Sequence, residues 1–259
     1  MPGSAPPSFV RLAAHSVRWQ LLGELATSDL RVRELVASVG HPQNLVSYHL
    51  RLLREAELVT KRRSSFDARD SYYHLDLDRC ADLLTASGIA LHPALQPVWP
   101  GSPAPPPGRS RRARVLFACT GNSARSPLAE ALLRHRAGDA VDVTSAGSHP
   151  REQIHPGAVR VLADDYGIDI ATQRTRPLDS TTRGRFDYVI SLCDKVREVC
   201  PEFPGHPRHI HWSIPDPAPQ GTRGRAAEAA ICRTARDIDA RIGHLLHVLP
   251  TTDTQEVHA

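Results

Sequence analysis

The stretch VLFACTGNSARSPLAEALL, residues 115–133, decides the fold of the second half of this chain. Its apolar start belongs to a predicted strand over 114–120, and the apolar residues after it have the spacing of a helix over about 126–135. Cys119 lies in the turn between these elements, and Arg125 follows it after five small or polar residues. A strand that leads into such a loop before a helix is typical of an anion-binding loop in an α/β fold.

The spacing between Cys119 and Arg125 has a chemical reason. Backbone N–H groups of a short loop at a helix N-terminus point toward a bound anion, and their positive field favours the thiolate form of a cysteine. Arg125 adds a planar fork for two anion oxygens. Gly121 allows close backbone approach, and Ser126 can donate to the sulfur. A structural cysteine beside an unrelated arginine is the alternative. We predict Cys119 as a nucleophile and an oxyanion cradle formed by Thr120, Gly121, Asn122, Ser123, Ala124, Arg125 and Ser126.

The rest of the second half alternates between strand and helix patterns. Further strands are predicted over 141–145, 186–193 and 208–214, and further helices over 156–166 and about 223–248. Strands that are separated by helices favour a parallel sheet with helices on its faces. We therefore expect residues 114–250 to form an α/β domain with a parallel four-stranded sheet flanked by helices.

Upstream of this domain, residues 93–113 form a predicted linker. Seven prolines lie between Pro93 and Pro107, and neither a helix interior nor a central strand could hold them. Residues 96–114 also carry four arginines and no acidic residue. These arginines could contact DNA phosphates, although a solvated linker is the simpler interpretation.

Residues 9–92 show the pattern of a winged helix-turn-helix, an α+β fold. Helices are predicted over 17–26, 30–39 and 44–55, with Gly40 as the stop of the second helix. Strands over 58–62 and 71–77 flank a polar tip. Leu45, Leu50 and Leu53 form the expected buried face of the third helix. In this arrangement the third helix enters the major groove of DNA.

Polar side chains at the start of the third helix and basic ones in the hairpin fit DNA binding. Gln and Asn can pair bidentately with adenine, and Lys and Arg bind phosphates. A polar helical hairpin that serves only dimerisation is the alternative. We predict contacts to duplex DNA from Gln43, Asn44, Ser47, Tyr48, Arg51, Lys61, Arg62 and Arg63.

The segments LVSYHLRLLREAELVTKRR (45–63) and DSYYHLD (70–76) resemble the ArsR family of winged-helix repressors. The resemblance implies a homodimer that binds operator DNA and releases it when a metal or metalloid binds. The best-known arsenic sensors of that family carry Cys-x-Cys in the helix before the recognition helix, where this chain has Arg31 and Arg33. Because trivalent arsenic needs thiolate ligands, we expect that sensing site to be missing, and we predict no metal site.

The segments CTGNSARSPLAEAL, TSAGSHP, HPGAVRVLADDYGIDI and SIPDPA resemble, in this order, the low-molecular-weight protein tyrosine phosphatases and their arsenate reductase branch. The resemblance implies that Asp216, which precedes a proline, is the general acid. An aspartate that only shapes the turn is the alternative. Ala218 and Pro219 stand where the phosphatases usually carry aromatic residues, which favours a small inorganic oxyanion. Pro127 after Ser126 resembles the phosphatase branch instead.

The segment SLCDKVREVCPEFP, residues 191–204, resembles the redox segment of thioredoxin-coupled arsenate reductases. The resemblance implies that Cys119 attacks arsenate and that Cys193 then forms a disulfide with Cys119 as arsenite leaves. Cys200 would next attack Cys193 and free Cys119. Two core cysteines are the alternative. We expect no bound cofactor, and the reductant would be an external thioredoxin-type protein or a low-molecular-weight thiol.

Composition sets the remaining limits. The chain has 259 residues and a net charge of +4, with no apolar run that could span a bilayer and no secretory signal, so a cytoplasmic protein without membrane contact is expected. Five cysteines do not suggest a disulfide framework, and Cys80 and Cys232 fit no step of the relay. We expect a transcriptional repressor joined to an arsenate reductase that acts on arsenate and retains some phosphatase activity. A phosphatase fused to a DNA-binding domain, and a non-catalytic oxyanion or redox sensor, are the alternatives.

Overall fold

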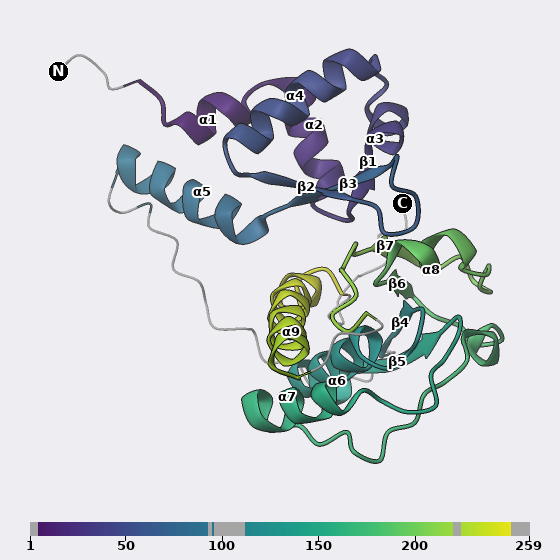
Figure 1. Ribbon diagram of the computed structural model, residues 1–259. Helices are drawn as coiled ribbons and strands as arrows, with labels where there is room; N and C mark the ends of the chain where they lie inside the picture. The colour runs from purple at the N-terminus through teal and green to yellow at the C-terminus, as the bar shows by residue number, and fades with distance from the viewer. Residues whose placement is uncertain (1–4, 93–94, 96–111, 220–223, 250–259) are drawn as a thin grey trace, which may run out of the picture. The chain divides into compact units, whose positions relative to one another are not determined.

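The computed structural model describes residues 5–92, 95, 112–219 and 224–249 (Figure 1). They fall into two compact units, one within Met1–Pro103 and one within Ala104–Ala259. Each unit has its own hydrophobic core. Most of the predicted linker lies outside the described residues, so the domain boundaries remain predictions.

The first unit is the expected winged helix-turn-helix. Its sheet has the order β1-β3-β2 with antiparallel pairing, and Lys61 of β2 lies opposite Tyr73 of β3. The β2–β3 hairpin is the wing. In chain order the elements are α1 (Ser8–Ala13), α2 (Ser16–Leu25), β1 (Leu30–Arg31), α3 (Val32–Val39), α4 (Gln43–Glu55), β2 (Val59–Arg63), β3 (Ser71–Leu75) and α5 (Leu77–Leu91).

One predicted core residue of the third helix is wrong. Helix α4 buries Val46, His49, Leu50 and Leu53, whereas Leu45 is 37% exposed. Spacings of four and three residues place 46, 50 and 53 on one face of a helix, and this face turns residue 45 toward solvent.

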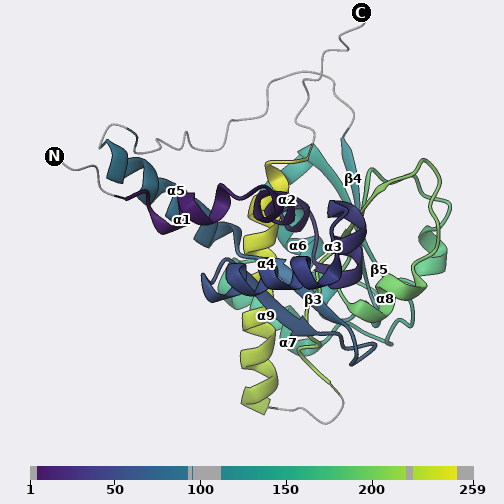
Figure 2. The same ribbon diagram turned by 90° about the horizontal axis from the view of Figure 1, so that it is seen from above.

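Other differences lie at the ends of the first unit and in its second helix. The sequence patterns predict neither α1 nor α5, which pack against each other (Figures 1 and 2). None of the side chains of α5 is fully buried, although Leu77, Cys80 and Leu83 pack partly buried against the first core. The helix therefore lacks the wide apolar face of a core helix. The first two residues of the predicted second helix form β1 instead, and that helix ends, as predicted, at Gly40 with a φ of 67°.

The second unit has the expected parallel four-stranded sheet, with the strand order β5-β4-β6-β7. Helices α6, α7 and α9 pack against one another beside it (Figure 1). In chain order the elements are β4 (Ala113–Cys119), α6 (Arg125–Ala137), the 3₁₀ turn η2 (Gly138–Ala140), β5 (Val141–Gly147), α7 (Pro156–Tyr166), the 3₁₀ turn η3 (Leu178–Thr181), β6 (Tyr188–Ser191), α8 (Asp194–Val199), β7 (Arg208–His211) and α9 (Gly224–Leu246).

The order of the strands indicates a binding site at the carboxyl end of β4. The chain passes from β4 to β5 on one side and later to β6 on the other, so the connections separate beyond the end of β4. Ligands of open α/β sheets bind at such a switch point. Strand β6 stops at Ser191, two residues earlier than predicted. The Leu192 N–H still donates to the Ala118 carbonyl of β4, and the chain then turns into α8, which begins at Asp194.

No helix in the described ranges is long and apolar enough to cross a membrane.

Candidate active site

Cys119 is the last residue of β4 and starts the loop that leads into α6. Its Sγ lies 3.0 Å from Ser126 Oγ and accepts a hydrogen bond from the Asn122 backbone N–H at 3.2 Å. Asn122 has a φ of 42°, in the left-handed region, so the loop turns sharply at this residue. The loop therefore wraps around the thiol, with Ser126 at the position where the sequence predicted a donor.

The loop carbonyls point away from the thiol and are held by a second segment. The carbonyls of Cys119, Thr120, Gly121 and Ser123 accept backbone hydrogen bonds from residues 148, 149, 151 and 155, at distances of 2.8 to 3.1 Å. Because the two polar groups of a peptide unit point in opposite directions, outward carbonyls leave N–H groups directed inward. The segment 148–155 thus fixes the loop as an anion cradle.

Asn122 links the cradle to buried polar groups behind it. Its Nδ2 donates to Ser126 Oγ and to Ser145 Oγ, both at 2.9 Å, and its Oδ1 accepts from Arg176 N–H at 2.6 Å. Ser145 in turn donates to Glu130 at 2.6 Å. The Asn122 side chain therefore uses three hydrogen bonds to hold its residue in the positive-φ conformation.

Arg125 is buried at the first position of α6. Its Nη1 donates to the Ile214 carbonyl at 3.0 Å, and its Nη2 lies 4.0 Å from Asp216 Oδ2. Ile214 lies 89 positions after Arg125 in the chain, and Asp216 follows it closely. The structure therefore brings Asp216 to the cradle from a distant part of the sequence. Asp216 Oδ1 also accepts from Ala218 N–H at 3.2 Å, so the carboxylate shapes its own turn as well.

Cys193 is buried beside the cradle, with its Sγ 3.3 Å from Thr120 Oγ1. Burial raises the pKa of this thiol, while Arg125, Thr120 and the Val196 N–H act in the opposite direction. Cys119 adds to the rise, because two thiolates would repel each other. Arg125 of the cradle is therefore close enough to Cys193 to favour its thiolate.

Cys200 is half-buried at the carboxyl end of α8, and burial raises its pKa to about 11. Helix α8 separates it from Cys193. The seven residue steps from Cys193 to Cys200 correspond to a helical rise of about 10 Å between their Cα atoms, whereas the Cα atoms of a disulfide lie roughly 4.4–6.8 Å apart. The folded helix therefore keeps these two thiols from bonding.

The other two cysteines lie away from the cradle. Cys80 packs against the core of the first unit, and burial raises its pKa to about 11. Cys232 of α9 packs against the core of the second unit. All five cysteines are free in the structure.

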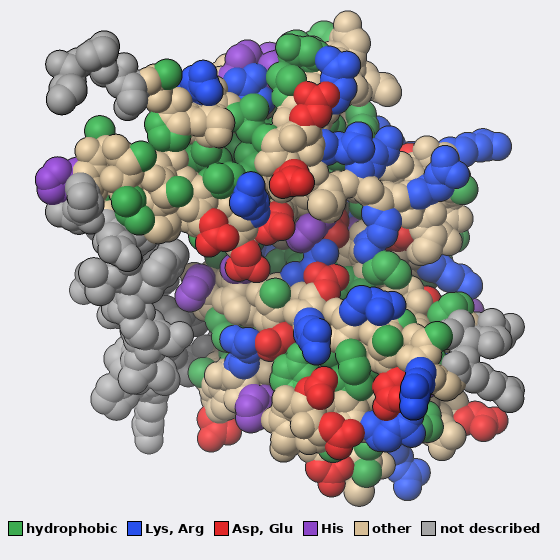
Figure 3. Space-filling view, turned by 60° about the vertical axis from the view of Figure 1, so that its left-hand side comes forward, with side chains coloured by type: hydrophobic (Ala, Val, Ile, Leu, Met, Phe, Trp, Pro, Cys, Tyr) green, Lys and Arg blue, Asp and Glu red, His purple; other side chains and the backbone are tan. Residues whose placement is uncertain are grey.

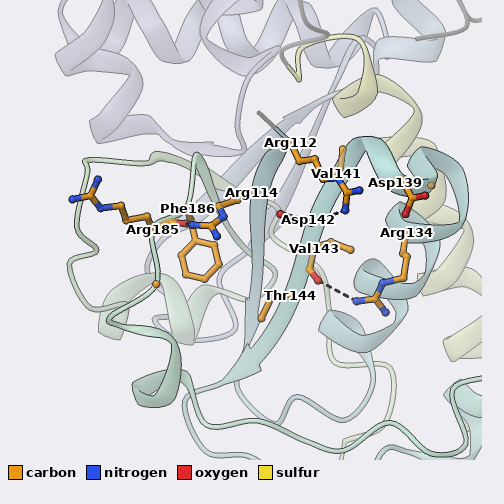
Figure 4. A pocket seen from close by; sticks show the side chains of 12 residues that line it. Arg112, Arg114, Arg134, Asp139, Val141, Asp142, Val143, Thr144, Arg185 and Phe186 are labelled. Atoms are coloured by element: carbon orange, nitrogen blue, oxygen red, sulfur yellow. Dashed lines mark hydrogen bonds and ion pairs between the residues drawn. The ribbon is translucent and has the colours of Figure 1, made fainter. Parts of the chain in front are cut away.

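Two cavities border the second unit. A groove of about 470 Å³ lies beside the cradle and is lined by Ser123 and residues 150–156. A cavity of about 560 Å³ lies near the amino ends of β4 and β5 (Figure 4). Its charged lining residues are Arg112, Arg114, Arg134, Arg185, Asp139 and Asp142, and Arg134 donates to the Val143 carbonyl at 3.1 Å. Its lining residue closest to the cradle along the sheet, Thr144, pairs with Leu116, which lies about 10 Å from Cys119 along β4, so the cavity does not belong to the cradle.

In the first unit, the predicted DNA contacts lie on the surface. Gln43, Asn44, Ser47, Tyr48 and Arg51 are all exposed and share one face of α4. Lys61 and Arg63 are exposed on β2, with Arg62 partly buried between them. Arg51 also lies over the Tyr48 ring, 5.5 Å from its centre. On the face drawn in Figure 3, positive and negative side chains are interspersed.

Arg31 and Arg33, at the expected positions of sensor thiolates, form ion pairs. Arg31 contacts Glu34 at 3.1 Å and Asp70 at 3.2 Å, and Arg33 contacts Asp70 at 3.1 Å. These contacts tie the start of α3 to the wing. Within the described residues, no group of three or more His, Cys, Asp or Glu could hold a metal ion.

Several residues of the site were not predicted from sequence. The segment 148–155, Ser145 and Glu130 act through backbone atoms or through partners far away in the chain. Gly147 is the most constrained of them, because a Cβ there would lie 2.7 Å from Thr120 O and 2.8 Å from Asn122 N. Their sequence signals are the motifs that carry the family resemblance: CTGNSARSPLAEAL contains Glu130, TSAGSHP contains Ser145 and Gly147, and HPGAVRVLADDYGIDI starts at His155.

Comparisons with known proteins agree with this arrangement. The family described as "Low molecular weight phosphotyrosine protein phosphatase" matches residues 114–252, and the family described as "Bacterial regulatory protein, arsR family" matches residues 15–61. The arsenate reductase of Brevibacillus brevis is 39% identical over 104 residues, which are 40% of this chain and 76% of that protein. The arsenate reductase of Halalkalibacterium halodurans is 34% identical over 128 residues, which are 49% of this chain and 91% of that protein.

Two solved structures are also similar. A low molecular weight protein tyrosine phosphatase from T. tengcongensis is 27% identical with a TM-score of 0.45, over 53% of this chain and 99% of the other. A thioredoxin-dependent arsenate reductase from Corynebacterium glutamicum is 25% identical with a TM-score of 0.43, over 88% of this chain and 95% of the other.

Proposed function

The chain belongs to the low molecular weight phosphotyrosine protein phosphatase family, and on this premise we propose that it is a thiol-dependent arsenate reductase joined to an ArsR-type DNA-binding domain. The relatives named arsenate reductase support the choice of substrate. The observation that carries the proposal is the position of Cys193, whose sulfur lies 3.3 Å from Thr120 Oγ1 in the same cradle as Cys119. A phosphatase would need no second thiol there.

In the first step, the Cys119 thiolate attacks arsenate held by Arg125 and the inward N–H groups of the loop. A sulfur–arsenic bond forms and an arsenic–oxygen bond breaks, with Asp216 protonating the departing oxygen to give water. The contact between Arg125 and Asp216 supports this role, because it places the carboxyl 4.0 Å from the arginine that would hold the oxyanion. The cradle and Arg125 offset the negative charge that accumulates on the oxyanion.

In the second step, the Cys193 thiolate attacks the sulfur of Cys119. A sulfur–sulfur bond forms, and the electron pair of the sulfur–arsenic bond goes to arsenic, which leaves as arsenite in the trivalent state. Two observations support this step: Cys193 Sγ lies 3.3 Å from Oγ1 of Thr120, the neighbour of Cys119 in the chain, and Cys119 contributes to the raised pKa of Cys193.

In the third step, Cys200 attacks Cys193 and releases Cys119. The length of α8 implies that this helix must unwind at least in part before the two sulfur atoms can meet. Unwinding would also expose Cys200 and remove the burial that raises its pKa. The resulting Cys193–Cys200 disulfide would be reduced by an external dithiol of the thioredoxin type or by a low-molecular-weight thiol.

A phosphatase activity on small esters is the second candidate. Cys119, Arg125 and Asp216 are sufficient for it, and Pro127 after Ser126 resembles the phosphatase branch. Such activity would need neither Cys193 nor Cys200, so the same variants separate the two activities.

For the first unit, we propose operator binding through the exposed face of α4 and the wing, as a homodimer. The match to the arsR family supports DNA binding. Exposed apolar side chains on α5, among them Leu84, Ile89 and Leu91, would suit a helix that pairs with a second copy.

The test measures arsenite production from arsenate by the purified chain with thioredoxin, thioredoxin reductase and NADPH. We expect sustained turnover in the parent protein and none in Cys119→Ser, Cys193→Ser or Cys200→Ser. Cys232→Ser is the matched control, since this thiol lies on α9 outside the cradle. Cleavage of p-nitrophenyl phosphate without arsenite production would instead identify a phosphatase.

A further inference from the structure

A buried polar cluster lies directly behind Cys193. Asp194 Oδ1 accepts a hydrogen bond from Ser213 Oγ at 2.6 Å and lies 3.1 Å from His211 Nε2. The other ring nitrogen of His211 lies 2.8 Å from Ser191 Oγ. Exposed fractions of these four residues do not exceed 6%. None of them takes part in the three steps above.

The cluster joins three segments that the relay needs. Asp194 follows Cys193 and begins α8, and His211 ends β7. Ser213 immediately precedes Ile214, whose carbonyl binds Arg125 of the cradle. One carboxylate therefore connects the backbone of the second thiol to the stem of the loop that carries Asp216.

A buried carboxylate is stable only when its hydrogen bonds are satisfied, and losing one partner is expensive. His211 fixes the geometry further, because its ring is held at both nitrogens. A carboxylate held in this way restricts the neighbouring backbone more strongly than an apolar contact would, since hydrogen bonds are directional. The restricted backbone is that of Cys193.

We propose that Asp194, held by His211 and Ser213, is a positioning residue that keeps the Cys193 sulfur directed at Cys119. The inference rests on the proposed relay and deepens it. In this role Asp194 acts through the placement of Cys193 and takes no part in bond making or breaking. A displacement of about 1 Å at a reacting centre can slow a reaction by orders of magnitude, and the attack of one thiolate on another sulfur requires such alignment.

The test observes the attack of Cys193 without arsenate. The background carries Cys80→Ser, Cys200→Ser and Cys232→Ser, so that only Cys119 and Cys193 remain. Hydrogen peroxide oxidises the Cys119 thiolate to a sulfenic acid and is reduced to water. Cys193 then attacks this sulfur, a sulfur–sulfur bond forms, the sulfur–oxygen bond breaks, and the hydroxide that leaves becomes water. Dimedone traps any sulfenic acid that Cys193 does not reach.

Mass spectrometry gives two quantities in each variant, the rate of Cys119 oxidation and the ratio of disulfide to dimedone adduct. We expect Asp194→Asn to lower the ratio at least roughly tenfold and Ser213→Ala to lower it less, with the Cys119 oxidation rate within about twofold of the parent. Asp187→Asn is the matched control, because Asp187 accepts from Arg114 N–H at the other end of the same sheet. It should leave both quantities unchanged.

Two outcomes would overturn the proposal: an unchanged ratio in Asp194→Asn, or a ratio that falls only together with the Cys119 oxidation rate, as general distortion of the fold would cause. Arsenite production by the parent protein is measured separately. If arsenate is not reduced but the ratio still depends on Asp194, the reductase proposal fails and the positioning role remains. If arsenate is reduced and the ratio is insensitive to Asp194, the positioning role alone fails.

Discussion

Gly147 shows how one residue without a functional group can control the cradle. It ends β5 against the loop, where a Cβ would approach two backbone atoms to less than 3.0 Å. Backbone atoms in a loop held by hydrogen bonds cannot move aside as a flexible side chain can. The position therefore has room for hydrogen only.

We expect Gly147→Ala to lower arsenate turnover at least roughly tenfold and the free energy of unfolding by about 1–3 kcal/mol. Gly243→Ala is the control, because in α9 the nearest atom to its Cβ would be a side-chain nitrogen at 3.8 Å. That change should be neutral or slightly stabilising. Full activity in Gly147→Ala would show that the loop can shift without losing its function.

His49 on α4 predicts a pH dependence of the first unit. Burial lowers its pKa below 6.5, and His15, Arg18 and His41 add to the effect. The unfolded chain therefore binds more protons than the folded one as the pH falls through this region. The stability contribution of neutral His49 is complete above about pH 6.5 and is lost below it.

We expect α4 to lose stability between pH 7 and pH 5, and His49→Gln to lose less over the same range. Native-state hydrogen exchange of peptides from residues 43–55, corrected for the intrinsic pH dependence of exchange, measures this. His155→Gln, in the second unit, should not alter exchange in α4. An identical pH profile in His49→Gln would assign the effect to other groups.

Among the elements of the second unit, α8 controls when the proposed relay could finish. It is six residues long, it separates Cys193 from Cys200, and its first residue is the anchored Asp194. A short helix has few hydrogen bonds to lose, so it can unwind at modest cost. The third step of the relay depends on this property.

We expect arsenate-oxidised protein to be cut by trypsin after Lys195 and Arg197 at least roughly tenfold faster than reduced protein, because cleavage requires locally unfolded backbone. Cleavage after Arg160 in α7 is the internal control and should not change. Oxidised Cys200→Ser should resist cleavage like the reduced protein. Equal cleavage of both redox states in the parent would contradict unwinding of α8.

Helix α4 and the wing make separate contributions to the proposed DNA binding. Asn44 lies on the exposed face of α4 and could contact base edges, whereas Lys61 lies on the wing and could contact only phosphates. We expect Asn44→Ala to reduce discrimination between operator and random duplex by about 1–3 kcal/mol. Lys61→Ala should weaken both complexes equally and reduce the salt dependence by about one phosphate contact. Fluorescence anisotropy over a salt series measures both. The reverse assignment of effects would contradict the docking geometry.

At the scale of the whole molecule, two separate cores imply two separate stabilities. Leu53 is fully buried in the first core, and no residue of the second core belongs to it. We expect Leu53→Ala to destabilise the first unit by about 2–5 kcal/mol and to abolish DNA binding at 37 °C, with arsenate turnover unchanged. Calorimetry and the coupled assay test this together. A parallel loss of turnover would mean that the units depend on each other for folding.

Local patterns were sufficient for most elements of both units, as α7 illustrates. Its predicted and observed bounds agree, because a proline at the start and Gly167 after its end mark both termini. Helix α5 was not predicted; none of its side chains is fully buried, and only Leu77, Cys80 and Leu83 pack partly buried against the core of the first unit. Val46, and not Leu45, is the buried residue at the start of α4. Either of these neighbours fits the apolar pattern, and the packing of α4 against α2 and α3 selects the face that carries Val46.

Local sequence patterns were sufficient for the two folds and for the cradle motif, because the strand, loop and helix of each pattern lie within about twenty residues of one another. The assignment of Cys193 and Cys200 to the relay rests on a resemblance and stays a prediction. The partners that come from distant parts of the chain to the cradle and to Cys193 are visible only in the folded structure. Ile214 binds Arg125, the segment 148–155 holds the loop carbonyls, and Ser213 and His211 hold Asp194. These partners are hydrogen-bonded across strand ends, and hydrogen bonds between residues far apart in the chain leave no periodic trace in its sequence.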